Sequence, residues 1–142
     1  MKEFFLILFF GKSILLTPDA VTLFGESSFI LQKPIKAVTS GASINIDVSS
    51  LIKWDEREGI VEFWSRAEKK FPGMMVEAWL FKENNEIVKF IYKGNILFNK
   101  EIVKLDLTSN NEVPTDVEFK KIKIFSQIKL EHVNIYWKNY KF

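Results

Sequence analysis

The sequence predicts an all-β domain, an antiparallel β-sandwich of jelly-roll type with about nine or ten strands and at most one short helix. Apolar and polar residues alternate with a period of two in many short runs, and turn-forming residues separate these runs at short intervals. No segment carries a sustained helical period. The chain of 142 residues has the length of one domain.

The clearest strand pattern lies near the C-terminus. Val133, Ile135 and Trp137 share one face of the last run, and polar residues occupy the other. The preceding run changes phase at Lys120–Lys121, which predicts a β-bulge there. A hairpin connection at residues 127–129 would then make the two runs an antiparallel pair.

The remaining strands are predicted from similar short patterns. Residues 74–82 are apolar on both faces, which predicts a central strand. Residues 51–58 are the best candidate for a short helix or an irregular loop. Turns are expected at residues 18–19, 25–28, 72–73, 83–86 and 93–95. The other strands are expected at residues 14–17, 21–24, 29–32, 42–49, 60–65, 87–92 and 102–107.

Residues 1–16 form an apolar N-terminal segment, and residues 17–142 the single predicted domain. The segment fits either a degenerate export signal that ends before about Thr17 or a buried first strand, with a membrane-anchoring helix as a third alternative. The apolar run 4–10 is too short for a stable membrane span. We expect a periplasmic or secreted protein if the segment is a signal, and a cytoplasmic one if it belongs to the fold.

Composition excludes several classes of site. The chain has no cysteine, which excludes disulfides, thiolate metal sites and cysteine nucleophiles. Its net charge is +2, but residues 120–142 alone carry +5. The basic residues are mostly lysines, which lack the planar fork that reads phosphates and bases. A nucleic-acid surface is therefore not expected, although one would use Lys120, Lys121, Lys123, Lys129, Lys138 and Lys141 with Phe125, Tyr136 and Tyr140.

The order of segments from residue 41 to residue 140 resembles the galactose-binding-like jelly roll of many carbohydrate-binding modules. The matching patterns are residues 44–48, 61–64, 74–81 after Pro72-Gly73, 103–107, 119–124 and 133–137. This resemblance concerns alternation and not chemical motifs, so no binding residue is carried over. It implies binding more than catalysis.

No catalytic apparatus is recognisable, and we expect no enzyme activity. His132 is the only histidine, and no Gly-x-Ser-x-Gly signature accompanies it. The acidic residues Asp55, Glu56, Glu58 and Glu62 surround Arg57 and fit a solvated loop better than a glycosidase pair. No cofactor is expected. A structural Ca²⁺ site would have to use Asp47, Asp55, Asp106 and Asp116, and these lack EF-hand spacing.

The outward face of the last strand is the main candidate site. It presents Tyr136, Tyr140, Asn134, His132 and Lys138, whose rings and polar groups suit a glycan or a protein partner. Trp54 and Trp64 are further candidates, whereas Trp79 and Trp137 are expected in the core. The alternative is that the two tyrosines pack at a sheet edge or under the N-terminal segment, with their hydroxyls reaching water.

These patterns favour a non-catalytic binding or accessory module that recognises a glycan or a protein. The alternative is a structural or assembly subunit of a surface or phage-like complex, with exposed sheet edges making its contacts. The sequence leaves open the ligand, the oligomeric state and the fate of residues 1–16.

Overall fold

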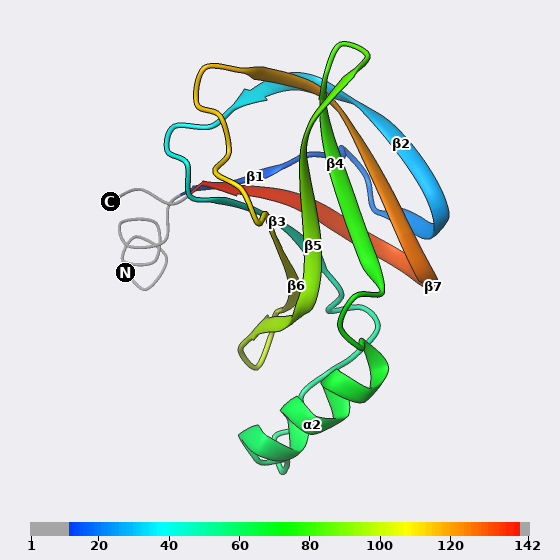
Figure 1. Cartoon of the computed structure of the whole chain (residues 1–142). Helices are drawn as coiled ribbons and strands as arrows, with labels where there is room; N and C mark the ends of the chain where they lie inside the picture. The colour runs from blue at the N-terminus through cyan, green and yellow to red at the C-terminus, as the bar shows by residue number, and fades with distance from the viewer. Residues whose placement is uncertain (1–11, 140–142) are drawn as a thin grey trace.

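The computed structural model describes residues 12–139, which form seven β-strands and one α-helix (Figure 1). All strand pairs are antiparallel. The elements in chain order are β1 Lys12–Leu15, β2 Val21–Lys36, β3 Ala42–Asp47, α2 Ile60–Lys70, β4 Val76–Lys82, β5 Asn85–Phe98, β6 Val103–Thr108 and β7 Glu118–Asn139.

Five of the strands close into a barrel in the order β7, β3, β6, β5, β4 and back to β7. The first half of β7 pairs with β4, and its second half pairs with β3. Strands β1 and β2 lie outside the barrel, and each pairs with β7. The all-β prediction is confirmed. The two-sheet jelly-roll sandwich is not, because a single sheet closes on itself here.

Strand β7 is continuous, so the hairpin predicted at residues 127–129 is wrong. Its pairing with β2 advances from Ser126 to Leu130 while β2 advances only from Gly25 to Leu23. The extra residues are bulges that bend the strand without reversing it. The Ser126 hydroxyl donates to the Ile128 carbonyl at 2.6 Å within this bend. The polar residues that resembled a turn therefore mark a bend.

The irregularity predicted at Lys120–Lys121 lies at that position, but its extra residues are on the neighbouring strand. Ile30 of β2 pairs with Lys121, and Ile35 pairs with Phe119. Four residues of β2 therefore lie opposite one residue of β7. Pro34 falls in this stretch, where its missing N–H cannot complete a ladder.

Helix α2 replaces the strand predicted at residues 60–65. Phe63 and Ala67, four residues apart, are its buried residues, whereas Val61 and Trp64 are exposed. Glu62 in the first turn and two lysines in the last turn complement the helix dipole. A pattern of six residues was too short to distinguish the two-residue period of a strand from the 3.6-residue period of a helix. Residues 51–58 form a loop with turns.

The described residues form seven strands where nine or ten were expected, because some predicted short strands are joined into longer ones. The turns predicted at residues 25–28 and 93–95 lie inside β2 and β5. Gly25 and Gly94 adopt positive φ angles of 70° and 98°, so each strand continues through a glycine. The predicted β4–β5 turn and the strand β6 are confirmed.

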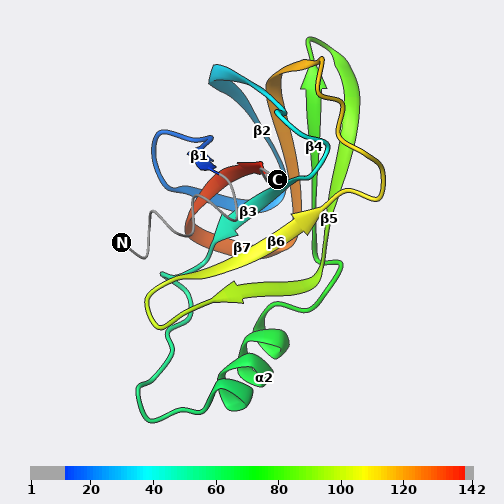
Figure 2. The same ribbon diagram turned by 90° about the vertical axis from the view of Figure 1, so that its left-hand side faces the viewer.

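The core fills the barrel, and α2 lies outside one end of it (Figure 2). Trp137 packs there with Phe90 and Phe119, at centroid distances of 6.2 and 6.3 Å. Tyr92 is fully buried, and its hydroxyl donates to the Phe71 carbonyl just after α2 at 2.6 Å. This hydrogen bond ties the helix to β5.

Tyr92→Phe should lower the free energy of unfolding at pH 7 by about 1–3 kcal/mol, because the Phe71 carbonyl loses its donor. Burial, assisted by the charge of Glu68, raises the pKa of Tyr92 to about 12. The unfolded chain releases this proton near pH 10, so the contribution of Tyr92 to stability falls between pH 10 and pH 12. Urea unfolding of both proteins should show their difference narrowing across that window. A difference that stays constant with pH would contradict this assignment.

Candidate functional site

The outer side of β3, β6 and the second half of β7 is polar. Ile44, Leu105 and Ile135 point into the core from these strands, so the alternate residues face outward. Strand pairing brings the outward residues into three rows. We call this surface the polar face. Its residues are Ser43, Asn45, Asp47, Lys104, Asp106, Asn134, Tyr136 and Lys138.

The centre of the polar face is a buried hydrogen-bonded cluster. Asp106 is only 4% exposed although it points away from the barrel core. Asn45 donates to one of its carboxylate oxygens at 2.7 Å, and Asn95 of β5 donates to the other at 3.0 Å. Each carboxylate oxygen thus has an amide donor, which offsets the cost of burying the charge. These hydrogen bonds hold the residues of the cluster in place next to the more exposed side chains of the polar face.

Tyr136 lies half-buried beside this cluster, opposite Asn45 on β3. The Lys104 ammonium lies 4.4 Å from the centroid of the Tyr136 ring. Burial raises the pKa of Tyr136, with a smaller contribution from the negative charge of Asp47. Burial also lowers the pKa of Lys104, and Asp47 opposes that shift. The three groups therefore share one partly desolvated environment.

The remaining residues of the polar face flank Tyr136 along β7. Asn134 pairs with Asp47, and Lys138 pairs with Ser43. The Asp47 carboxylate accepts a hydrogen bond from the Ser49 N–H at 2.9 Å. Burial lowers the pKa of Lys138; Asp106 opposes this shift and Lys104 adds to it. Hydrogen-bonding side chains thus lie on both sides of the tyrosine.

One described residue predicted for this face, His132, stands apart from it. His132 is exposed at a bulge with a φ of 53°, and its carbonyl accepts a hydrogen bond from the Ser50 hydroxyl at 2.9 Å. The bulge breaks the alternation, since Leu130 and Val133 are both buried. Tyr140 lies outside the described residues. Among the described residues, Asn134, Tyr136 and Lys138 of the predicted face lie together on β7.

Trp54 and Trp64 belong to a different region, beside α2. The Trp54 ring stacks on Phe63 at 5.6 Å, and its indole N–H donates to the Glu58 carbonyl at 2.8 Å. These contacts anchor the loop to the helix. Trp64 is 46% exposed on α2.

Trp54 also borders an open depression of about 760 Å³ that is lined by charges of both signs. Arg66 donates to both carboxylate oxygens of Glu58, at 3.0 and 2.9 Å. This hydrogen bonding holds the pKa of Glu58 below its usual range. A general acid needs a raised pKa, so Glu58 is poorly suited to that role. The other lining residues are Lys53, Asp55, Arg57 and Glu62.

Trp79, which was assigned to the core, lies half-buried on the outside of β4. The Lys89 and Lys123 ammonium groups lie 5.5 and 4.6 Å from its ring centroid. Lys121 lies 4.9 Å from the ring of Phe81 in the same way. Two lysines of the basic C-terminal stretch thus lie over aromatic rings.

Several residues of the polar face were absent from the predicted site. Asn45 and Asp47 alternate with apolar residues in the predicted strand 42–49, and Lys104 and Asp106 do so in the predicted strand 102–107. Only the pairing of β3 between β6 and β7 brings them beside Tyr136. Their alternation with apolar residues could have shown that they point outward. The sequence did not show the strand order, which is needed to place them beside Tyr136.

Among residues 12–139, no group of three or more His, Cys, Asp or Glu side chains is arranged to hold a metal ion. In the same range no helix is long and apolar enough to cross a membrane. No protein-family model, curated protein or solved structure matches the chain. The resemblance to galactose-binding-like modules therefore stays a prediction.

Asp106→Asn should lower the free energy of unfolding by about 1–3 kcal/mol. A carboxamide has only one acceptor oxygen, so either Asn45 or Asn95 loses its partner. Urea unfolding measures the change, and Asp116→Asn at an exposed position is the matched control. Equal stability of the two variants would show that the cluster contributes little.

Proposed function

We propose that the protein is a non-catalytic binding barrel that recognises a glycan through its polar face. The observation that carries this proposal is the half-exposed ring of Tyr136 between hydrogen-bonding side chains on paired strands. Asn134 and Lys138 flank Tyr136 on β7, and Asp47 and Lys104 lie on β3 and β6. Strand residues of a closed barrel hold such groups in fixed positions, which lowers the entropy lost on binding.

The donor and acceptor set suits sugar hydroxyls. Each sugar hydroxyl both donates and accepts, so it can bond to a carboxylate and to an ammonium or amide at once. Asp47 supplies the acceptor, Lys104 and Lys138 supply donors, and Asn134 supplies both. The Asp47 carboxylate is held by the Ser49 N–H, which fixes its direction.

The Tyr136 ring would supply the apolar contact. One axial face of a sugar ring carries C–H groups that pack on an aromatic ring. Lys104 now lies over the tyrosine, so a bound sugar would meet that ammonium as it approached the ring. Lys104 would thereby donate a hydrogen bond to a hydroxyl of the same sugar that stacks on the Tyr136 ring.

One further consideration supports a glycan over a catalytic role. Binding is what the resemblance to carbohydrate-binding modules implies. A protein partner would use the same residue types as anchors, and the experiment below separates the two ligands.

The full chain should bind one class of immobilised glycan on an array, and Tyr136→Ala should weaken that binding at least about tenfold. Asn134→Ala should weaken it to a smaller extent. Trp64→Ala is the matched control, since it removes a half-exposed aromatic side chain from α2. Calorimetry with the selected glycan gives the affinities, and circular dichroism checks that the variants fold.

The proposal would be contradicted if no glycan bound, or if Tyr136→Ala bound as tightly as the wild type. Stronger loss in Trp64→Ala than in Tyr136→Ala would move the site to the region of α2.

A further inference from the structure

Strand β2 has an open edge. It pairs with β7 along one side, and within residues 12–139 no strand pairs with its other side. At sixteen residues it is much longer than β1, the other edge strand. The N–H and C=O groups along a long edge form a template for another strand. A β-strand is therefore the kind of segment that fits this surface.

The stretch from Gly25 to Ile30 is the regular part of this edge, and the register shifts before it place their extra residues on β7. Outward residues from Thr22 to Ile30 are exposed, and the residues between them are buried or half-buried. Pairing with β7 is unbroken from Gly25 to Ile30. Lys33 and Pro34 follow, and both residue types discourage edge pairing. The usable edge is thus about residues 21–31.

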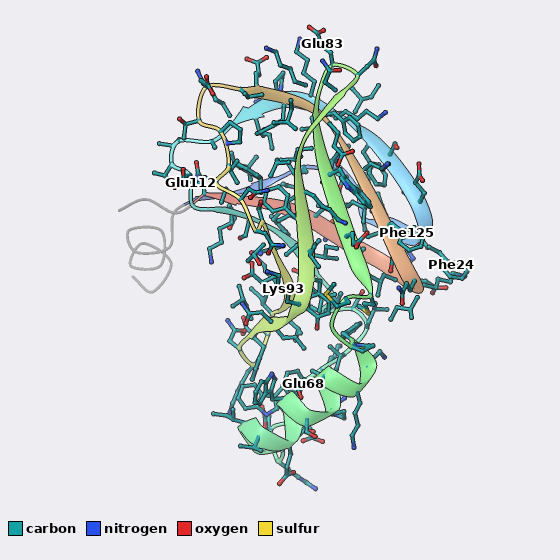
Figure 3. All side chains as sticks on the ribbon, viewed as in Figure 1. Phe24, Glu68, Glu83, Lys93, Glu112 and Phe125 are labelled. Atoms are coloured by element: carbon teal, nitrogen blue, oxygen red, sulfur yellow. The ribbon has the colours of Figure 1, made fainter. Side chains whose placement is uncertain are left out.

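Two large apolar side chains project outward from this segment. Ile30 is 83% exposed, more than any other large apolar side chain in the described residues, and Phe24 is 64% exposed. Figure 3 shows Phe24 extending away from the body of the molecule, on the side where β2 and β7 lie. Both side chains lie on the same face of β2. Ser27 is midway between them in the sequence and lies on the opposite face.

We propose that β2 pairs antiparallel with β2 of a second copy of this chain, around a two-fold axis at Ser27. In this register Phe24 lies opposite Ile30 of the second copy, and the symmetry makes the contact twice. Leu23 lies opposite Leu31 on the other face. Directly opposed apolar pairs are the unit of stabilisation between antiparallel strands.

The remaining pairs fit the same register. Gly25 lies opposite Phe29 of the second copy, where an aromatic ring can cover the strand at a residue without a side chain. Gly25 has free space around the position of a Cβ atom. Glu26 lies opposite Ser28, so no like charges face each other. Between residues 23 and 31, apolar residues therefore meet apolar residues or glycine, and polar residues meet polar ones.

Neighbouring registers are worse. An axis at Glu26 sets two glutamates against each other, which is repulsive. An axis at Ser28 sets Phe24 against Gln32 and Glu26 against Ile30. An axis at Phe29 sets Phe24 against Pro34. A two-fold axis placed between two neighbouring residues would set inward-facing residues of one copy opposite outward-facing residues of the other. The pattern of the strand thus selects the axis at Ser27 and a copy of itself as the partner.

Cysteine cross-linking tests the register directly, because the natural chain has no cysteine. In the proposed dimer the two residues at position 27 face each other across the axis, with Cα atoms about 4.5–5.5 Å apart. A disulfide spans that distance. Ser27→Cys should therefore form a covalent dimer on mild oxidation. Ser28→Cys, one residue away on the opposite face, is the matched control and should cross-link much more slowly.

Sedimentation of the full chain over a range of concentrations tests the association itself. The wild type should dimerise reversibly, and Ile30→Glu should weaken the dimer at least about tenfold, because each new carboxylate would face a Phe24 ring. Val61→Glu, which replaces a 76% exposed residue of α2, should leave the dimer unchanged. Both positions are exposed, so the variants should fold normally.

The proposal is overturned if the wild type stays monomeric at every concentration, or if Ser28→Cys cross-links as fast as Ser27→Cys. A dimer that Val61→Glu weakens and Ile30→Glu does not would also overturn it, by moving the interface to α2. The pairing is independent of the proposed glycan site, which glycan binding by Tyr136→Ala tests separately.

Discussion

Strand β7 hydrogen-bonds to four other strands, and the closure of the barrel depends on this. Its first half meets β4 and its second half meets β3, the two ends of the β4–β5–β6–β3 order. A straight strand of twenty-two residues could not turn from one to the other. The bulges between Ser126 and Val133 supply the bend, and the left-handed backbone of His132 is part of it. Among the strands of residues 12–139, closure leaves only β1 and β2 at a sheet edge.

The same strands that build the core carry the polar face. Ile135 and Trp137 point inward, while Asn134, Tyr136 and Lys138 alternate with them and point outward. Packing of the inward residues therefore fixes the positions of the outward ones. The buried carboxylate of Asp106 adds a second constraint, since its two amide partners come from β3 and β5. A face held in this way is suited to binding, because little order has to be gained when a ligand arrives.

The exposed apolar side chains have a different distribution. Phe24 and Ile30 lie on the open strand β2, and Val61 and Trp64 lie on the outer side of α2. Neither pair lies on the polar face. The inner residues of α2 instead attach the helix to the barrel, through the stacking of Trp54 on Phe63 and the bond from Tyr92 to Phe71. Ligand binding and self-association can thus use separate surfaces.

Local sequence by itself determined the all-β class, strand β6, the β4–β5 turn and the outward direction of Asn45, Lys104 and Tyr136. The turn follows from its turn-forming residues, and the other features follow from the two-residue period, which neighbouring residues are enough to define. Tertiary structure alone decided that β2, β5 and β7 continue through apparent turns, because pairing with a partner strand holds a bulge or a glycine in an extended chain. It also decided that residues 60–70 are helical, since the burial of Phe63 and Ala67 against the barrel outweighs a short alternation. The neighbours of Tyr136 likewise depend on strand order, which is set by contacts distant in sequence.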